Sequence, residues 1–275
     1  PVFDKNSAQG LYDCAQLLKK SIKGDAAIDA LAQRADDRMK ENAGGDVGDI
    51  DFRDAEKLFA EEKQSLLVVF QAMDTGGKDG TIRSVFGPLN AIGTHVHSFG
   101  KPSDRELAQD FLWRIHPHTP QKGQIVIFNR SHYEDVLIVR VHGWADAKTI
   151  ENRYEHIAAF ERLLVERGTK VVKIFLHISR DEQKERLEER LADPTKRWKF
   201  NPGDLPERAK WDDYMAAFED AMVGTSTKES PWYVVPANRK WYRNILVAKT
   251  LVDTLEEMDP KYPEPSYDWT KVVIE

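Results

Sequence analysis

Several apolar stretches of this chain are continuous, because their hydrophobic residues follow one another without alternating with polar ones. Residues 66–70 and 125–128 are apolar throughout. Continuous runs of this kind are typical of strands that are covered on both faces, as in parallel sheets. The pattern predicts five strands, at residues 65–70, 95–99, 125–128, 171–178 and 232–235.

Between these runs, apolar residues recur at helical spacing. Ile82, Val85, Phe86 and Leu89 follow the first strand in this way, and two capping boxes, at 103–106 and 179–182, mark further helix starts. The first box is expected to open a helix that carries Leu107, Phe111 and Leu112. The other predicted helices are 147–167, closed by Gly168, then 180–192 and 240–258. Strands alternating with helices predict a three-layer α/β fold with a mainly parallel sheet.

The pattern also divides the chain. Residues 1–50 form a charged helical extension that ends in the glycine-rich stretch 42–48, residues 51–258 form the core, and the proline-containing tail 259–275 is expected to wrap the surface. We find no internal repeat.

Composition narrows the function classes. Forty basic against 46 acidic residues leave a net charge of −6, so affinity for a polyanion depends on local clustering, and duplex nucleic acid is not an expected partner. The single cysteine, Cys14, excludes an internal disulfide and suits a reducing cytosol. No stretch approaches the ~20 apolar residues of a membrane span, and no signal peptide is recognisable. We expect a cytoplasmic protein that does not enter membranes.

The first candidate site is QAMDTGGKDGTIR, residues 71–83, directly after the first strand. Ligands of such sheets bind at the carboxyl ends of strands. The loop leaves backbone N–H groups open to phosphate oxygens at Gly76, Gly77 and Gly80, and Lys78 adds a positive charge. It departs from the usual phosphate loop, because Lys78 is followed by Asp79 instead of Ser or Thr. A plain Lys-Asp-Gly turn is the alternative.

Two carboxylates in this loop indicate a divalent cation. Asp74 and Asp79 would repel bare phosphate, and they make sense if a cation or a transferable proton lies between them and the ligand. Thr81 is placed to reach magnesium from the first helical turn, or to serve as a hydroxyl of the helix start.

The second candidate site, residues 129–135, follows the strand that ends at Phe128. Arg130 can make a forked contact to phosphate. Phosphate kinases commonly place an acidic metal ligand at the end of a neighbouring strand, where this chain has Asn129, so Glu134 or Asp135 would have to supply it. The alternative is a solvated helix start.

The third candidate is the helix 180–191. Leu187 and Leu191 form its narrow apolar stripe, while Arg186 and Arg190 lie four residues apart, where an anion between them would relieve their repulsion. Its glutamates favour a solvated, salt-bridged helix as the alternative. In a phosphoryl-transfer enzyme, an arginine-bearing lid at residues 180–210 would exclude water and neutralise charge.

Together these motifs resemble the polyphosphate kinase 2 family, over residues 50–258. The resemblance rests on Asp74-Thr75-Gly76-Gly77-Lys78-Asp79-Gly80-Thr81, Asn129-Arg130-Ser131-His132-Tyr133-Glu134-Asp135, Asp193-Pro194, Lys196-Arg197-Trp198-Lys199-Phe200, Val234-Val235-Pro236-Ala237 and Lys240-Trp241. It implies a P-loop kinase fold like thymidylate kinase with a helical lid, dependence on magnesium with manganese as a substitute, and reversible phosphoryl transfer between inorganic polyphosphate and nucleotides. With Asn129, the chain resembles the subgroup of this family that phosphorylates both AMP and ADP. The resemblance also implies a dimer or a dimer of dimers.

The resemblance also assigns roles. Asp74, Lys78 and Arg130 are the expected catalytic residues, and Asp74 with Glu134 or Asp135 would hold the metal. Phosphate or polyphosphate would contact Gly76, Gly77, Lys78, Asp79, Gly80, Thr81, Arg83, Arg130, Tyr133, Arg186, Arg190 and Lys199. The nucleotide, with adenine as its base and guanine as the alternative, would contact Asn129, Glu134, Asp135 and Trp198. An ATP-dependent nucleoside monophosphate kinase and a non-catalytic nucleotide- or polyphosphate-binding module are the alternatives.

Overall fold

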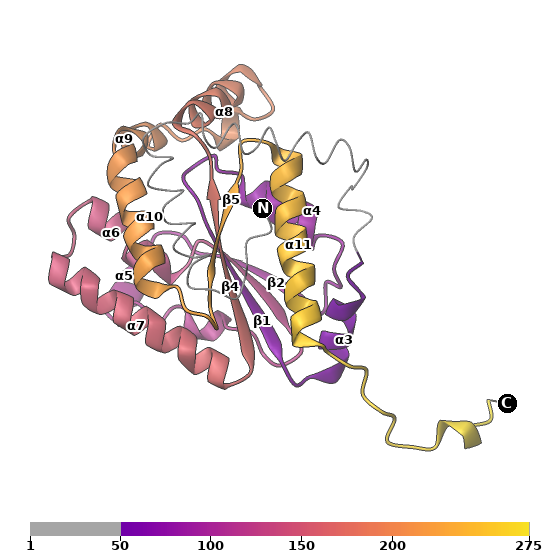
Figure 1. Cartoon of the computed structure of the whole chain (residues 1–275). Coiled ribbons are helices and arrows are strands. Elements are labelled where there is room, and N and C mark those ends of the chain that lie inside the picture. The colour runs from indigo at the N-terminus through magenta and orange to yellow at the C-terminus, as the bar shows by residue number, and fades with distance from the viewer. Residues whose placement is uncertain (1–50, 275) are drawn as a thin grey trace.

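A five-stranded sheet lies at the centre of the computed structural model, which describes residues 51–274 (Figure 1). The strand order is β2-β3-β1-β4-β5, and every neighbouring pair is parallel. The parallel sheet predicted from the sequence is therefore confirmed, whereas the extension 1–50 lies outside the described residues. The strands are β1 (Ser65–Gln71), β2 (Thr94–Ser98), β3 (Ile125–Asn129), β4 (Thr169–His177) and β5 (Trp232–Pro236).

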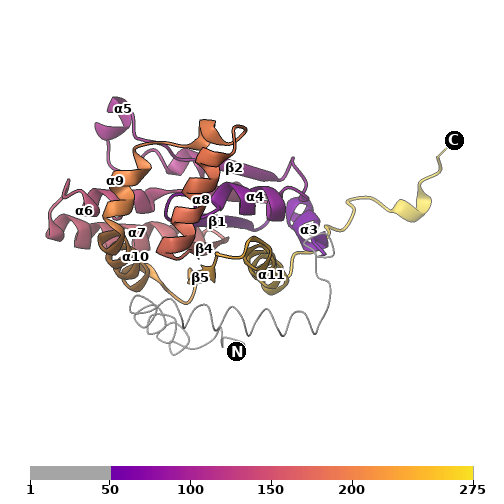
Figure 2. The same ribbon diagram turned by 90° about the horizontal axis from the view of Figure 1, so that it is seen from above.

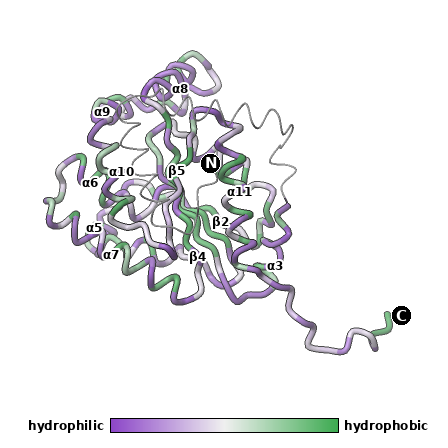
Figure 3. The backbone as a smooth tube through the Cα atoms, viewed as in Figure 1, coloured by the Kyte–Doolittle hydropathy of each residue, from purple (hydrophilic) through white to green (hydrophobic). Residues whose placement is uncertain are grey.

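Burial explains why the central strands read as continuous apolar runs. All seven residues of β1 are buried, because β3 and β4 flank it and helices cover both of its faces. At the edge of the sheet, β2 has no fully buried residue, and its sequence THVHS accordingly mixes polar and apolar positions. Figure 3 shows hydrophobic strands at the centre, surrounded by helices in which hydrophilic and hydrophobic residues are mixed.

Helices cover both faces of the sheet (Figure 2). Helix α11 packs against α3 and α4 on one face, and α7, α10 and α6 pack together on the other. Among residues 51–274, none of these helices combines the length and apolar character needed to cross a bilayer. The helices are α3 (Arg53–Glu61), α4 (Lys78–Phe86), α5 (Asp104–Leu107), α6 (Ile138–Val141), α7 (Ala147–Glu166), α8 (Arg180–Ala192), α9 (Asp204–Ala209), α10 (Trp211–Thr225) and α11 (Lys240–Met258), with short 3₁₀ helices η2 (His116–His118), η3 (His132–Asp135), η4 (Arg197–Lys199) and η5 (Trp269–Lys271).

The connections place a crevice beside the central strand. After β1 the chain enters α4 on one face of the sheet, whereas after β3, the neighbour of β1, it enters η3 and α6 toward the other face. Chains that leave adjacent strands in opposite directions open a crevice at the carboxyl ends of those strands. The loop after β1 and the segment after β3 therefore line the same site.

Some local predictions were wrong. The capping box at Ser103 and Glu106 is present, but α5 ends at Leu107 because the Asp110 side chain accepts a hydrogen bond from the N–H of Leu112 and favours a turn. The expected helix through Phe111 and Leu112 does not form. In α8, Leu187 is buried as predicted, whereas Leu191 is exposed.

Only one of the two hydrogen bonds of the second capping box is present. Ser179 accepts from the N–H of Glu182, but the Glu182 carboxylate binds Arg186 Nε (2.6 Å). The N–H of Ser179 donates instead to Asn238 Oδ1 (2.9 Å), which follows β5. This exchange ties the start of α8 to the neighbouring strand end.

The C-terminal tail does not wrap the domain as predicted. Residues 261–274 are exposed and lead away from the end of α11 (Figure 1).

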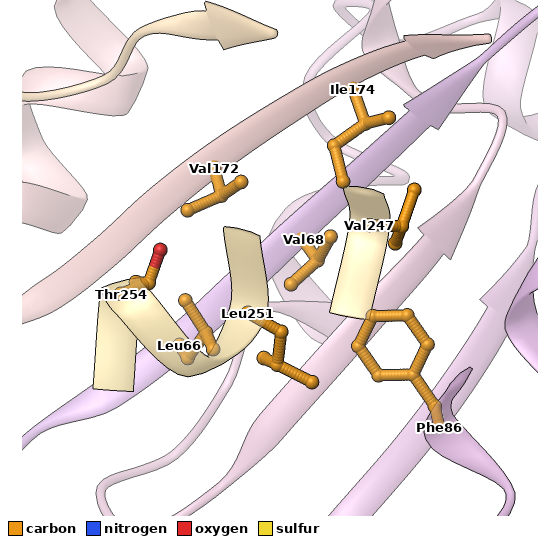
Figure 4. A pocket seen from close by; sticks show the side chains of 8 residues that line it. All are labelled: Leu66, Val68, Phe86, Val172, Ile174, Val247, Leu251 and Thr254. Atoms are coloured by element: carbon orange, nitrogen blue, oxygen red, sulfur yellow. The ribbon is translucent and has the colours of Figure 1, made fainter. Parts of the chain in front are cut away.

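The core also contains a small apolar gap between the sheet and α11 (Figure 4). The one polar side chain there, Thr254, donates its hydroxyl proton to Thr250 O (2.7 Å), so the gap offers a ligand no free polar group. It is lined by Leu66, Val68, Phe86, Val172, Ile174, Val247, Leu251 and Thr254.

Candidate active site

The loop between β1 and α4 has a tightly constrained backbone. Thr75 and Gly77 both have positive φ, at 64° and 98°. A Cβ at Gly76 would lie 2.6 Å from Ala72 Cβ and 2.8 Å from Met73 O, so the turn requires glycine there. A Cβ at Gly80 would make only an ordinary contact. Sequence reasoning treated the glycines alike, but steric need in the folded loop is concentrated at Gly76 and Gly77.

The space beside Gly77 is filled by an arginine that the sequence analysis missed. A Cβ at Gly77 would lie 2.0 Å from Nη1 of Arg243, which is on α11 and 3% exposed. Burial and the nearby Arg186 lower the pKa of Arg243 to about 10. Its Nη2 donates to Asn244 Oδ1 (2.8 Å), and within residues 51–274 no carboxylate pairs with it. A positive charge therefore lies directly behind the glycine loop.

Lys78 and Arg130 bring two more cations to this crevice. Lys78 Nζ donates to Ala72 O (3.1 Å), and burial together with the Arg130 charge lowers the pKa of Lys78. Arg130 has φ of 61° and donates to Asp74 Oδ1 (3.1 Å). Burial alone would lower the pKa of Arg130, but the carboxylates of Glu134 and Asp74 raise it. The three predicted catalytic residues, Asp74, Lys78 and Arg130, thus lie together.

Of the two alternatives for a further metal-binding carboxylate, the structure places Glu134 in this cluster. Its charge interacts with Arg130, Lys78 and Asp74, and burial raises its pKa. Asp135 instead faces Arg153, whose Nη1 lies 3.7 Å from Asp135 Oδ1 and donates to Asp135 O (2.7 Å). Burial raises the pKa of Asp135 to about 6.

Asn129 links the two halves of the crevice. Its Nδ2 donates to Asp79 Oδ1 (2.9 Å) at the start of α4 and to Ser98 Oγ (3.3 Å) at the end of β2. Asp79 is exposed, so this contact lies at the rim of the site. The amide thereby connects the carboxyl ends of β2 and β3 to the glycine loop.

Two residues predicted to contact phosphate face the protein instead. Thr81 is fully buried, and its hydroxyl donates to Gly77 O (3.1 Å), as a hydroxyl of the helix start does. Tyr133 is 0% exposed, and its hydroxyl oxygen lies 2.8 Å from both Glu161 Oε1, to which it donates, and Thr225 Oγ1, so the hydroxyl cannot reach the crevice. Arg83, in the last turn of α4, is exposed.

The predicted lid residues separate into two groups. Arg186 is buried and donates to Glu182 Oε1, Thr75 O (2.9 Å), Ala237 O (2.6 Å) and Asn238 O (2.9 Å), so it fixes α8 to the glycine loop and does not share an anion with Arg190. Arg190 lies 4.0 Å from Asp204 and donates weakly to Lys199 O (3.4 Å). Lys199 Nζ lies 5.0 Å from the ring of Trp198, which is 78% exposed.

The carboxylates suit magnesium that is completed by substrate. Within residues 51–274, no three side chains of metal-binding type come together. Magnesium is commonly held through one or two carboxylates plus substrate phosphates and water, and it prefers oxygen ligands. Asp74 and Glu134 supply such oxygens beside two cations that attract phosphate, so the residues present fit this ion.

The structure combines a parallel sheet, a glycine loop with a lysine at the start of α4, and an arginine after the adjacent strand. These features define a P-loop kinase fold with a phosphate-binding crevice. A model of the polyphosphate kinase 2 (PPK2) family matches residues 36–263. The chain belongs to this family.

Relatives and solved structures agree with the assignment. An AMP/ADP-polyphosphate phosphotransferase of Meiothermus ruber is 56% identical over 80% of this chain and 82% of its own. An ADP-polyphosphate phosphotransferase of Rhodopseudomonas palustris is 44% identical over 75% and 76%. The crystal structure of polyphosphate kinase 2 from Arthrobacter aurescens TC1 superposes with a TM-score of 0.78, at 49% identity, over 79% of this chain and 78% of that one.

Proposed function

We propose that this chain transfers a phosphoryl group reversibly between inorganic polyphosphate and the nucleotides AMP and ADP. The observation that carries the proposal is the cluster of Asp74, Lys78, Arg130 and Glu134 at the carboxyl ends of β1 and β3. Relatives named as polyphosphate phosphotransferases of AMP/ADP and of ADP support the substrates. A GDP-polyphosphate phosphotransferase of Mycolicibacterium smegmatis, 37% identical over 63% of this chain, supports a test of guanine nucleotides.

In the forward reaction an oxygen of the nucleotide's terminal phosphate attacks the end phosphorus of polyphosphate. One P–O bond forms as the phosphoanhydride bond opposite to it breaks, and the shortened chain leaves with the electron pair. Such a transfer depends mainly on positioning and charge neutralisation. Lys78 and Arg130 lie where they can neutralise the oxygens of the transferred group, and Asp74 holds Arg130 in place. Asp74 and Glu134 would hold magnesium, which would supply positive charge to the phosphate groups of the substrates.

One donor comparison tests the proposal. Purified protein with magnesium is supplied with AMP or ADP and with either polyphosphate or ATP as donor, and the nucleotide products are quantified. Formation of ADP and ATP from polyphosphate is expected. Activity with ATP alone would indicate a nucleoside monophosphate kinase, and binding without turnover would indicate a sensor module.

The role of Asp74 has its own test. Asp74→Asn keeps the size of the side chain but removes the charge that pairs with Arg130 and would bind magnesium. We expect turnover with polyphosphate and ADP to fall by about two to three powers of ten. Turnover near that of the unaltered protein would refute the assigned role. Asp268→Asn, in the exposed tail with Lys271 and Thr270, is the matched control.

Further parts of the proposal concern the setting of the enzyme. The single cysteine suits a reducing cytoplasm, and manganese is expected to replace magnesium in part. We infer a homodimer or homotetramer, which light scattering of the purified protein would test.

A further inference from the structure

Gln71, the last residue of β1, joins the base of the glycine loop to the segment that carries Glu134. Its side chain is 1% exposed, and the backbone N–H of Ser131 lies 3.3 Å from one end of its amide. Because a backbone N–H can only donate, the amide oxygen must be at that end. The amide nitrogen then faces Glu134 Oε1 at 3.0 Å.

The neighbouring hydroxyl agrees with this orientation. Ser131 Oγ accepts a hydrogen bond from the N–H of Tyr133 (3.2 Å), which leaves its own proton for Gln71 Oε1, also at 3.2 Å. Gln71 therefore accepts twice from Ser131 and donates to Glu134. Since every polar atom is satisfied in one arrangement, the amide is fixed in position.

The chemistry of the donor matters because Glu134 belongs to a charged cluster. Arg130 and Lys78 act on its carboxylate from the crevice side. A cationic donor at residue 71 would neutralise Glu134, whereas a neutral amide orients the carboxylate and leaves its negative charge for the ligand. A buried amide on a central strand is also a rigid support, because β1 is enclosed by β3 and β4.

From this geometry we propose that Gln71 is the positioning residue for Glu134 and thereby sets the affinity of the site for the nucleotide. The inference rests on the proposed function, in which Glu134 is a magnesium ligand, and on the expected contact of Glu134 with the nucleotide. Gln71 itself is buried and acts through Glu134 and not on the substrate.

Gln71→Met tests this, because methionine has nearly the same length and cannot hydrogen-bond to a carboxylate as an amide does. The dissociation constant of ADP is measured by calorimetry without polyphosphate, and KM and kcat are measured for both substrates. We expect the dissociation constant and KM for ADP to rise roughly tenfold, as for loss of a hydrogen bond to a charged group, while KM for polyphosphate changes less than twofold. Gln64→Met is the matched control, because Gln64 bonds Glu61 and Met258 at the opposite end of β1.

A double-mutant cycle shows whether Gln71 acts through Glu134. In a Glu134→Ala background, Gln71→Met is expected to change ADP binding less than twofold. A tenfold loss in both backgrounds, no loss in either, or an equal rise in KM for polyphosphate would overturn the proposal. Gln71→Asn, an amide one methylene too short to bridge Ser131 and Glu134, must give the same result and replaces the methionine variant if that does not fold.

This design separates the inference from the proposed function. If the unaltered protein binds ADP but forms no ATP from polyphosphate, the proposed function fails, while the ADP-binding cycle still decides the role of Gln71.

Discussion

The buried ion pair between Lys173 on β4 and Glu161 on α7 allows a quantitative prediction for Lys173→Met. Both side chains are 0% exposed, and Lys173 Nζ lies 2.5 Å from Glu161 Oε2 and donates to Thr225 O (2.8 Å). Glu161 also accepts from Tyr133 (2.8 Å) and Ser230 (3.1 Å). The pair therefore anchors η3, which carries Glu134, to three other elements of the core.

Removal of one partner leaves a buried charge without compensation, which costs about 3–5 kcal/mol in free energy of unfolding. In a chain of this size, 1 kcal/mol corresponds to about 2–4 °C in Tm, so Lys173→Met should lower Tm on the order of 10 °C. Urea unfolding of the purified variant gives the free energy directly. In the double variant with Glu161→Gln, which removes both charges and keeps an acceptor for Tyr133, we expect at least half of the loss to be recovered.

The loss in Lys173→Met should also depend on pH. Burial alone would raise the pKa of Glu161, but the Lys173 ammonium and the hydrogen bond from His132 hold it below its ordinary value. Without Lys173, burial raises the pKa in the folded state above that in the unfolded state. Such a group contributes stability below its unfolded pKa and loses it as pH rises through the folded pKa. The variant should therefore differ from the unaltered protein less at pH 5 than at pH 8.

A surface pair on the same helix provides the control. Lys148 lies 3.2 Å from Glu151 on α7, with side chains 74% and 68% exposed. Lys148→Met should change the free energy of unfolding by less than about 0.5 kcal/mol. If Lys173→Met costs less than about 1 kcal/mol, or costs the same at both pH values, the reasoning from the buried charge is refuted.

Three further predictions concern the site. Gly77→Ala combines a positive φ with a Cβ 2.0 Å from Arg243 Nη1. It should lower the free energy of unfolding in urea by about 1–3 kcal/mol and reduce kcat/KM at least roughly tenfold. Gly100→Ala is the control and should change neither quantity, because a Cβ there has nothing within 4 Å. Arg186→Leu loses four hydrogen bonds and should destabilise the protein by about 2–4 kcal/mol; an unchanged Tm would contradict this. Because burial raises the pKa of Asp135 to about 6, this group loses its contribution to stability as pH rises from about 4 to 6. The urea midpoints at pH 5 and 7.5 should therefore differ less for Asp135→Asn than for the unaltered protein.

The sequence predicted those features whose signals are local. Continuous apolar runs located the central strands, because a strand flanked and covered on every side tolerates few polar residues. Strand alternation with helices then implied that the loops after β1 and β3 meet at one edge, and this predicted that Asp74, Lys78 and Arg130 lie together. The different surroundings of Glu134, beside Arg130 and Lys78, and of Asp135, beside Arg153, were beyond the sequence, because they depend on how η3 turns.

Other features depend on contacts between distant segments. Arg243 looks like one more charge on a long helix, and nothing within α11 indicates that its guanidinium reaches Gly77, more than 160 residues earlier. Gln71 looks like the polar end of an apolar run, although it bonds Ser131 and lies against Glu134. Arg186 was assigned to a mobile lid from its charge, whereas its hydrogen bonds to backbone oxygens fix it to the core. A charge pattern alone does not distinguish a solvated cation from one buried by tertiary packing.

The two buried arginines explain how the glycine loop keeps a strained shape. Thr75 has φ of 64°, a conformation that costs a non-glycine residue about 1–3 kcal/mol, and its carbonyl accepts from Arg186. Arg243 occupies the space beside Gly77, so the loop cannot collapse in that direction. Because both cations are held by the protein, the loop presents its backbone before phosphate arrives, and binding need not bear the cost of ordering it.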